Sequence, residues 1–134
     1  MSQENVEIVR DCLAAFTAGG LDAAAEFWHA DIDWRAVEGS VDDAGPIHGI
    51  EAMRRYAHDW LDTFDDVTFV PEELLDLGDD RVVAVQRLAG RARLSGIETE
   101  LRYVVVYTVR EGKIVRGREY DEKPEALKAV GLAE

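Results

Sequence analysis

Cysteine and histidine are scarce in this chain of 134 residues. Cys12 is the single cysteine, so no disulfide can form within the chain. The three histidines are scattered, and no cysteine and histidine residues have the spacing of a zinc site. The sequence also lacks a glycine-rich phosphate-binding loop and a metal-binding triad. We therefore expect neither a structural metal nor a cofactor.

Basic residues are few, and long apolar segments are missing. Fifteen lysine and arginine residues stand against 28 aspartate and glutamate residues, which gives a formal net charge of −13. Such an acidic chain is not expected to bind nucleic acid or an anionic membrane surface. No apolar run approaches the roughly 18 residues of a membrane span, and the first ten residues do not resemble a signal peptide. We expect a cytoplasmic protein with one domain over residues 1–134, because this length matches the commonest domain size.

Helical periodicity marks the first half of the chain. Apolar residues recur at three- and four-residue steps from Val6 to Phe16, and Gly19 and Gly20 end the pattern. A short alanine-rich helix is predicted over residues 21–28. The strongest signal lies in residues 49–64, where one helix face carries Met53, Tyr56, Ala57, Trp60, Leu61 and Phe64.

The second half is rich in β-branched residues and predicts hairpins of one antiparallel sheet. The expected strands cover about residues 67–77, 81–93, 97–109 and 113–121. A brief strand over residues 31–35 and a last short helix that opens at Pro124 complete the pattern. We therefore predict an α+β domain in which a curved sheet and three N-terminal helices enclose a pocket.

The run Val104-Val105-Val106 is apolar on both faces of its predicted strand. A strand of this kind indicates that the outer face of the sheet is also covered. A homodimer is the simplest cover, so we expect two chains to pair through this face.

The two long hairpins set the register of the sheet. Each is predicted to turn over three residues that end in glycine, residues 94–96 and 110–112. Counting back from these turns places Arg87, Tyr103 and Glu119 in one row with their side chains on one face. A shift of one residue flips Arg87 to the other face, and a shorter Ser95-Gly96 turn presents Gln86 instead.

If this row faces the helices, it carries proton-transfer chemistry. Glu119, held against aromatic walls, is the candidate acid or base. Tyr103 would donate a hydrogen bond to an enolate or alkoxide oxygen, and Arg87 would bind an anionic group. The alternative is that Arg87 and Glu119 form a structural ion pair that spans Tyr103. The candidate substrate-binding residues that would shape an apolar pocket are Trp34, Tyr56, Trp60 and Phe16.

The sequence resembles SnoaL-like members of the nuclear transport factor two (NTF2-like) superfamily. The similarity covers nearly the whole chain and rests on short segments in a fixed order: Asn5-Val-Glu-Ile-Val-Arg, Gly19-Gly-Leu-Asp-Ala, Asp31-Ile-Asp-Trp, Ile47-His-Gly-Ile-Glu-Ala, Gly112-Lys-Ile-Val and Arg118-Glu-Tyr. The resemblance implies a cone of curved antiparallel or mixed sheet wrapped around three helices, commonly as a dimer. It says less about function, since the family includes cyclases, isomerases, epoxide hydrolases and dehydratases.

Comparison with the steroid isomerases of this superfamily shows three departures. Their tyrosine donor would fall at Cys12, their aspartate base at Ala36, and their second acid near Val104 or Val105. None of these residues has the required chemistry, so the resemblance does not imply their mechanism here.

Two other branches resemble the chain more closely. The aspartate-arginine-aspartate set of limonene-type epoxide hydrolases would fall at Ala89, Arg87 and Glu119, so one carboxylate is missing. The acid/base aspartate of the SnoaL-type aldol cyclases matches Glu119, which precedes Tyr120, whereas their histidine would fall at Val105.

These observations favour a cofactor-independent lyase or isomerase that binds a small hydrophobic or cyclic carbonyl ligand. In this hypothesis Glu119 moves a proton next to the carbonyl, and Tyr103 and Arg87 stabilise the oxyanion. One alternative is a non-catalytic ligand-binding or dimerisation domain. A second alternative is an enzyme related to the epoxide hydrolases.

Overall fold

The computed structural model describes residues 2–41 and 43–132. The elements, in chain order, are α1 (Ser2–Ala25), β1 (Trp28–Arg35), β2 (Ile47–His48), α2 (Ile50–Leu61), β3 (Phe64–Asp76), β4 (Arg81–Ala92), β5 (Glu98–Arg110), β6 (Lys113–Tyr120) and α3 (Lys123–Ala129). The sheet has six strands in the order β2-β1-β6-β5-β4-β3. All neighbours are antiparallel except β1 and β6, which are parallel. The predicted α+β class with a mixed curved sheet is confirmed.

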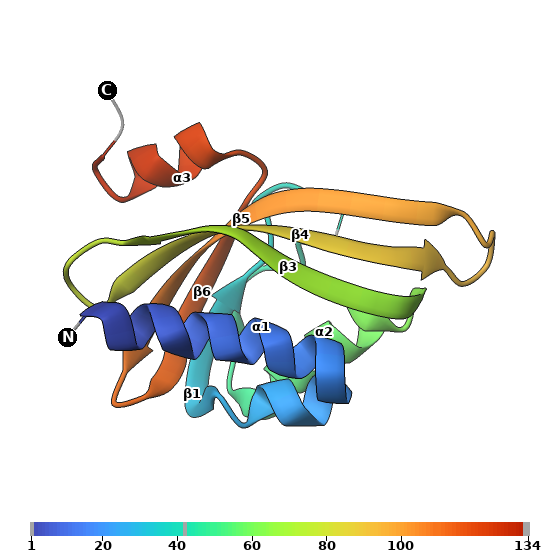
Figure 1. Ribbon diagram of the computed structural model, residues 1–134, viewed down its shortest axis with the longest axis horizontal. Helices are drawn as coiled ribbons and strands as arrows, with labels where there is room; N and C mark the ends of the chain where they lie inside the picture. Colours follow the sequence, from blue (N-terminus) through green and yellow to red (C-terminus); the bar gives the residue numbers. More distant parts are fainter. Residues whose placement is uncertain (1, 42, 133–134) are drawn as a thin grey trace.

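The N-terminal helices cover one face of the sheet. Helix α1 kinks at Gly20, whose φ of 77° is readily adopted by glycine, so its two parts and α2 supply the three expected helical segments. Figure 1 shows α1 and α2 on one side of the sheet and α3 on the other. The predicted stripe of α1 is buried, with Val6, Val9 and Leu13 in the main core. No described helix is both long and apolar enough to cross a membrane.

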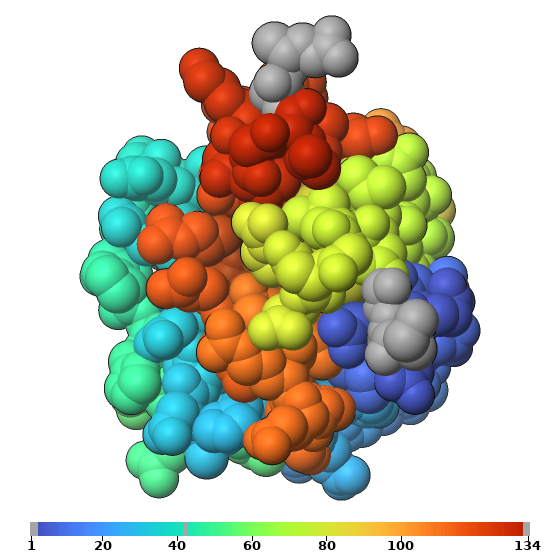
Figure 2. All heavy atoms as spheres, turned by 90° about the vertical axis from the view of Figure 1, so that its left-hand side faces the viewer, coloured from blue at the N-terminus to red at the C-terminus, as the bar shows by residue number. Residues whose placement is uncertain are grey.

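The outer face of β5 is covered by the chain itself at Val104 and Val106. Val105 belongs to the main core, whereas Val104 and Val106 point to the opposite face and form a second cluster with Val83 and Ala126 of α3. Figure 2 shows α3 above the turns that join β3 to β4 and β5 to β6. The apolar run was therefore correctly assigned to two buried faces, but α3 supplies a cover that the sequence had led us to expect from a second chain. This strand no longer argues for a homodimer.

Strand β3 forms one edge of the sheet, and its ladder with β4 is irregular. Register shifts occur between Asp65 and Thr68 and between Pro71 and Glu73. Asp66 adopts a positive φ of 57° at the first irregularity. The other edge, β2, has only two residues.

A short ion pair joins the two-residue strand β2 to β1. His48 lies opposite Asp33, with Nδ1 2.6 Å from Oδ1. The hydrogen bond to Asp33, then the charges of Asp33 and Asp31, raise the pKa of His48 above its ordinary value of 6.5. Protonated His48 therefore stabilises the strand pair below the unfolded pKa, and this contribution is lost as pH rises through the folded pKa.

We expect an NMR titration of the His48 imidazole to show a midpoint above 6.5 in the wild-type protein. Asp33→Asn removes the main hydrogen-bond acceptor and its charge, so the midpoint should fall. A wild-type midpoint at or below the ordinary value would contradict the pairing.

Candidate functional site

The carboxylate of Glu119 lies on the inner face of β6 and is held by two aromatic side chains. Its Oε2 accepts a hydrogen bond of 2.7 Å from Trp34 Nε1 and one of 2.8 Å from the Tyr56 hydroxyl. Trp34 comes from β1 and Tyr56 from α2, so the carboxylate is bound from two elements that are distant in sequence. Hydrogen bonds from such donors stabilise the ionised form of a carboxylate and fix its orientation.

The carboxylate borders a small cavity between the helices and the sheet. The cavity has a volume of about 60 Å³, and most of its lining is apolar or aromatic. The predicted Glu119 and Tyr103 both contact it. The four predicted substrate-binding residues also line this cavity: Trp34, Tyr56, Trp60 and Phe16. The structure therefore brings six of the seven predicted site residues to one space.

Gly117 allows Trp34 to reach the carboxylate. The two residues are paired in the parallel ladder of β1 and β6, and the indole lies directly over the glycine. A Cβ atom at position 117 would lie 2.0 Å from Cζ3 of Trp34, which is far inside van der Waals contact. Because Gly117 has no side chain, the indole crosses β6 at this position, and its Nε1 reaches Glu119, two residues further along the same face.

A buried glutamine links two tyrosines on the opposite wall. The Tyr107 hydroxyl donates to Gln86 Oε1, and Gln86 Nε2 donates to the Tyr103 oxygen, each over 2.9 Å. Gln86 is only 2% exposed. Since the Tyr103 oxygen accepts from the amide, its own O–H hydrogen is available to donate in another direction. Burial, and secondarily the charge of Glu119, raise the pKa of Tyr103, so this hydroxyl stays protonated at neutral pH.

We expect Gln86→Leu to lower the free energy of unfolding by about 1–3 kcal/mol, because the buried hydroxyls of Tyr103 and Tyr107 lose their partner. Urea unfolding at neutral pH measures this change. Adding Tyr107→Phe removes one of the unsatisfied hydroxyls and should restore part of the loss. A Gln86→Leu variant as stable as the wild-type protein would show that the amide does not connect the two tyrosines.

The predicted position of Arg87 is wrong. Gln86, not Arg87, pairs with Tyr103 across β4 and β5. Arg87 lies on the outer face, where Nε is 3.2 Å from Glu72 and Nη1 is 3.1 Å from Glu100. The guanidinium therefore neither enters the cavity nor forms the alternative ion pair with Glu119.

The length of the β4–β5 turn explains this error. Ala92 and Ile97 are hydrogen-bonded across the hairpin, so the connection has four residues, 93–96, rather than the predicted three. One additional residue shifts the pairing by one position, and a shift of one position exchanges the two faces of a strand. The alternative register, in which Gln86 shares a face with Tyr103, is therefore correct for this face. It assumed a shorter turn, however, whereas the turn is one residue longer than expected.

For the β5–β6 hairpin, the sequence predicts the correct face for Glu119 but the wrong residue opposite it. Glu119 lies opposite Val105, so Tyr103 is two residues away from the predicted pairing. Glu111 and Gly112, both with positive φ, form a two-residue turn that pairs Arg110 with Lys113. A register irregularity at Val109 adds a second shift, and two shifts of one residue restore the original face.

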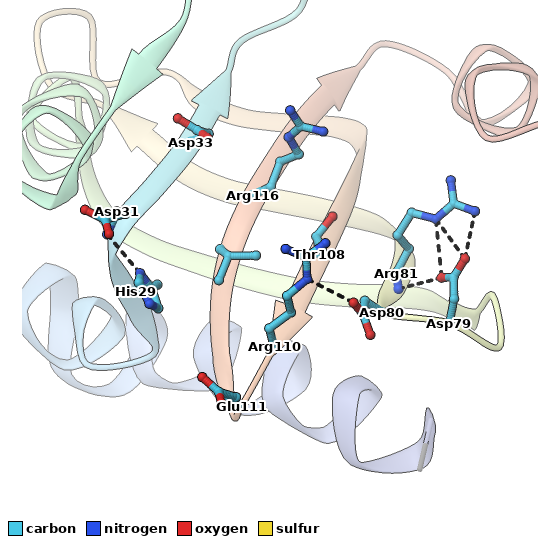
Figure 3. A pocket seen from close by; sticks show the side chains of 11 residues that line it. His29, Asp31, Asp33, Asp79, Asp80, Arg81, Thr108, Arg110, Glu111 and Arg116 are labelled. Atoms are coloured by element: carbon cyan, nitrogen blue, oxygen red, sulfur yellow. Dashed lines mark hydrogen bonds and ion pairs between the residues drawn. The ribbon is translucent and has the colours of Figure 1, made fainter.

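A larger hollow lies on the opposite side of the sheet. It has a volume of about 690 Å³ and is lined by polar side chains of β1, β5, β6 and the β3–β4 turn, as Figure 3 shows. Two ion pairs lie within it: Arg81 lies 2.9 Å from Asp79, and Arg110 lies 2.9 Å from Asp80. The described residues contain no group of three or more acidic, histidine or cysteine side chains arranged to hold a metal. The aromatic cavity is therefore the stronger candidate for chemistry.

Cys12 also lines the cavity, but its thiol is inert. Burial raises the pKa of Cys12 to about 12. Its Sγ donates to the carbonyl oxygen of Ala24 over 3.7 Å. The nucleophile in cysteine chemistry is the thiolate, which is scarcely populated here at neutral pH.

Two kinds of comparison relate this arrangement to known proteins. The family model of the SnoaL-like domain matches residues 9–117. Among curated proteins, no sequence matches the chain significantly. Solved structures match it over most of its length, at low sequence identity.

Three of these structures illustrate the similarity. A Bacillus subtilis protein provisionally named an isomerase has a TM-score of 0.77 and 20% identity, with 98% of this chain and 95% of that chain covered. A Mycobacterium tuberculosis protein in complex with estradiol-17beta-hemisuccinate has a TM-score of 0.74 and 20% identity, with 87% and 92% covered. A Jannaschia protein provisionally named a SnoaL-like polyketide cyclase has a TM-score of 0.73 and 21% identity, with 99% and 94% covered. The fold and the family match agree with the resemblance seen in the sequence, and the chain belongs to the SnoaL-like domain family.

Proposed function

We propose that this protein binds a small carbonyl compound and moves a proton at the carbon next to the carbonyl group, as a cofactor-independent isomerase or lyase. The observation that carries the proposal is that Glu119 and Tyr103 face one aromatic cavity from the same side of the sheet. The names of two similar structures, an isomerase and a polyketide cyclase, support this class of reaction. The steroid complex of a third supports a cyclic ligand.

The two side chains have complementary roles in this reaction. The Glu119 carboxylate removes the proton from the α-carbon, the C–H electron pair forms a carbon–carbon double bond, and the carbonyl π electrons move to oxygen. The hydroxyl of Tyr103 donates a hydrogen bond to this oxyanion. If the ketone carries a neighbouring carbon–carbon double bond, return of the proton from Glu119 to the far carbon of the dienolate completes an isomerisation. In an aldol step the enolate carbon instead attacks a second carbonyl group, and the new alkoxide takes the proton from Glu119.

The lining of the cavity favours a neutral group at the reacting end of the ligand. Its described residues include no lysine or arginine, since Arg87 lies on the outer face. Trp34, Tyr56, Trp60 and Phe16 supply aromatic walls that suit the apolar atoms next to a carbonyl group. The outward position of Arg87 also separates it from Glu119, so we do not propose epoxide hydrolysis.

Hydrogen exchange tests the proposal without knowledge of the natural substrate. Cyclohexanone is incubated in D₂O with the protein, and the loss of its α-hydrogen signal is followed by proton NMR. We expect exchange above the buffer rate with the wild-type protein, and Tyr103→Phe should slow it because the oxyanion loses a donor. Binding of cyclohexanone without any exchange above the buffer rate would instead favour the non-catalytic ligand-binding domain.

A further inference from the structure

The cavity beside Glu119 is too small to enclose a complete ring-shaped ligand. A cavity of roughly 150 Å³ accommodates one benzene ring, and typical ligand pockets are about 300–1,000 Å³. The cavity here has about 60 Å³. It has room for a carbonyl group and its immediate neighbours, so the rest of any larger ligand must lie elsewhere.

A groove of about 650 Å³ adjoins this cavity on the outside, and we call it the outer groove. Tyr56 and Trp60 line both spaces and thus form a shared wall. The apolar residues of the outer groove include Pro46, Ile47 and Leu101.

The outer groove continues the cavity along the same two elements. On α2, Ala52, Tyr56 and Trp60 follow one another at four-residue spacing and so share a helix face. On β5, Leu101 in the groove and Tyr103 in the cavity are two residues apart and share a sheet face. Leu101 is 39% exposed, so part of its apolar side chain is accessible in the groove.

Residues 43–46, which border the groove, are anchored through Asp43. Asp43 accepts hydrogen bonds from Arg35 over 3.0 and 2.9 Å. It also accepts from the backbone N–H groups of Gly39 and Gly45. These bonds lower the pKa of Asp43 far below its ordinary value, so the carboxylate stays ionised and keeps these partners at neutral pH. Pro46 therefore directly follows Gly45, whose backbone N–H is bonded to Asp43.

From this continuity we infer that the outer groove binds the apolar part of the same ligand whose carbonyl group enters the cavity. The substrate class is thus an elongated neutral molecule with a ketone at one end and an apolar extension of several carbons, which passes between the cavity and the groove at Tyr56 and Trp60. This inference rests on the proposed function only for the carbonyl end.

A second groove is the natural control. It has a volume of about 440 Å³ and shares Phe16, Leu61 and Phe69 with the cavity. Charged side chains border both grooves: Arg93 and Asp62, 2.7 Å apart, lie at the second groove, and Arg55 and Asp59 line the outer groove, so charge does not separate the two. The outer groove instead reaches Tyr56, which bonds directly to Glu119.

The test compares the binding of cyclohexanone and 4-hexylcyclohexanone by isothermal titration calorimetry. Burial of the hexyl chain should tighten binding to the wild-type protein by about tenfold or more. Ala52→Trp fills the outer groove and should reduce this ratio towards one. Val67→Trp fills the second groove instead and should leave the ratio unchanged.

Leu101→Glu serves as a second variant if Ala52→Trp does not fold, because it places a charge in the outer groove at an already exposed position. It should likewise reduce the ratio towards one. A wild-type ratio near one, or a ratio that falls in Val67→Trp and not in the outer-groove variants, would overturn the inference. The α-hydrogen exchange of cyclohexanone is measured separately, so failure of the proposed chemistry is distinguishable from failure of the groove assignment.

Discussion

Glu119→Gln will slow the α-hydrogen exchange of cyclohexanone by about 100-fold to 10,000-fold, the usual contribution of a positioned general base. The substitution keeps the size of the side chain and removes the group that takes the proton. The amide oxygen can still accept the hydrogen bonds that Trp34 and Tyr56 donate to Glu119. Rates are measured by proton NMR in D₂O at equal protein concentration.

A matched control separates chemistry from folding in this experiment. Glu119→Asp keeps a carboxylate on a shorter side chain and should retain part of the exchange activity. Circular dichroism and thermal unfolding should show that both variants keep the fold. Full activity in Glu119→Gln would eliminate Glu119 as the base.

Gly117→Ala will lower the free energy of unfolding by about 3–5 kcal/mol, because overpacking and a lost hydrogen bond to a charged group act together. The added methyl group would occupy the space of the Trp34 ring, 2.0 Å from Cζ3. The indole must move away from β6, and its Nε1 then withdraws from Glu119. Urea unfolding measures the stability, and the change in total tryptophan emission relative to the wild-type protein, which also contains Trp28 and Trp60, reports the displaced ring.

Gly90→Ala is the matched control, since Gly90 also lies within a strand. A Cβ atom there would meet its nearest neighbour, the carbonyl oxygen of Asp65, at 3.4 Å. That distance is ordinary contact, so the change in stability should stay within about 1 kcal/mol. Equal stability of the two variants would show that the indole does not rest on Gly117.

The order and type of the elements were accessible from the sequence because they depend on local periodicity. The stripe from Val6 to Phe16 and the β-branched runs gave elements that the structure confirms within a few residues. The pairing of β1 with β6 joins strands that are distant in the chain, and no local pattern specifies it. The alternation of Val104, Val105 and Val106 correctly indicated two buried faces, but not that α3 covers one of them.

The candidate site was predictable only as far as the turns were predictable. A connection one residue longer than expected exchanged Arg87 for Gln86, whereas two compensating shifts kept Glu119 on the correct face. Two sequence signals were available and not used. Gln86 and Arg87 are adjacent polar residues within an apolar run, so one of the two must point to the core-facing side of the strand, and Gly117 is a glycine inside a strand, which often marks the close approach of another group.

The two edges of the sheet have a consequence for aggregation. An exposed edge offers unpaired backbone groups on which a further strand can assemble, and proteins avoid this with short strands, proline, charges and bulges. Here β2 offers only two residues, and β3 combines Pro71, two breaks in its ladder and several carboxylates. Neither edge presents a long, flat template, so fibril-like growth by strand addition is disfavoured even when the chain is concentrated.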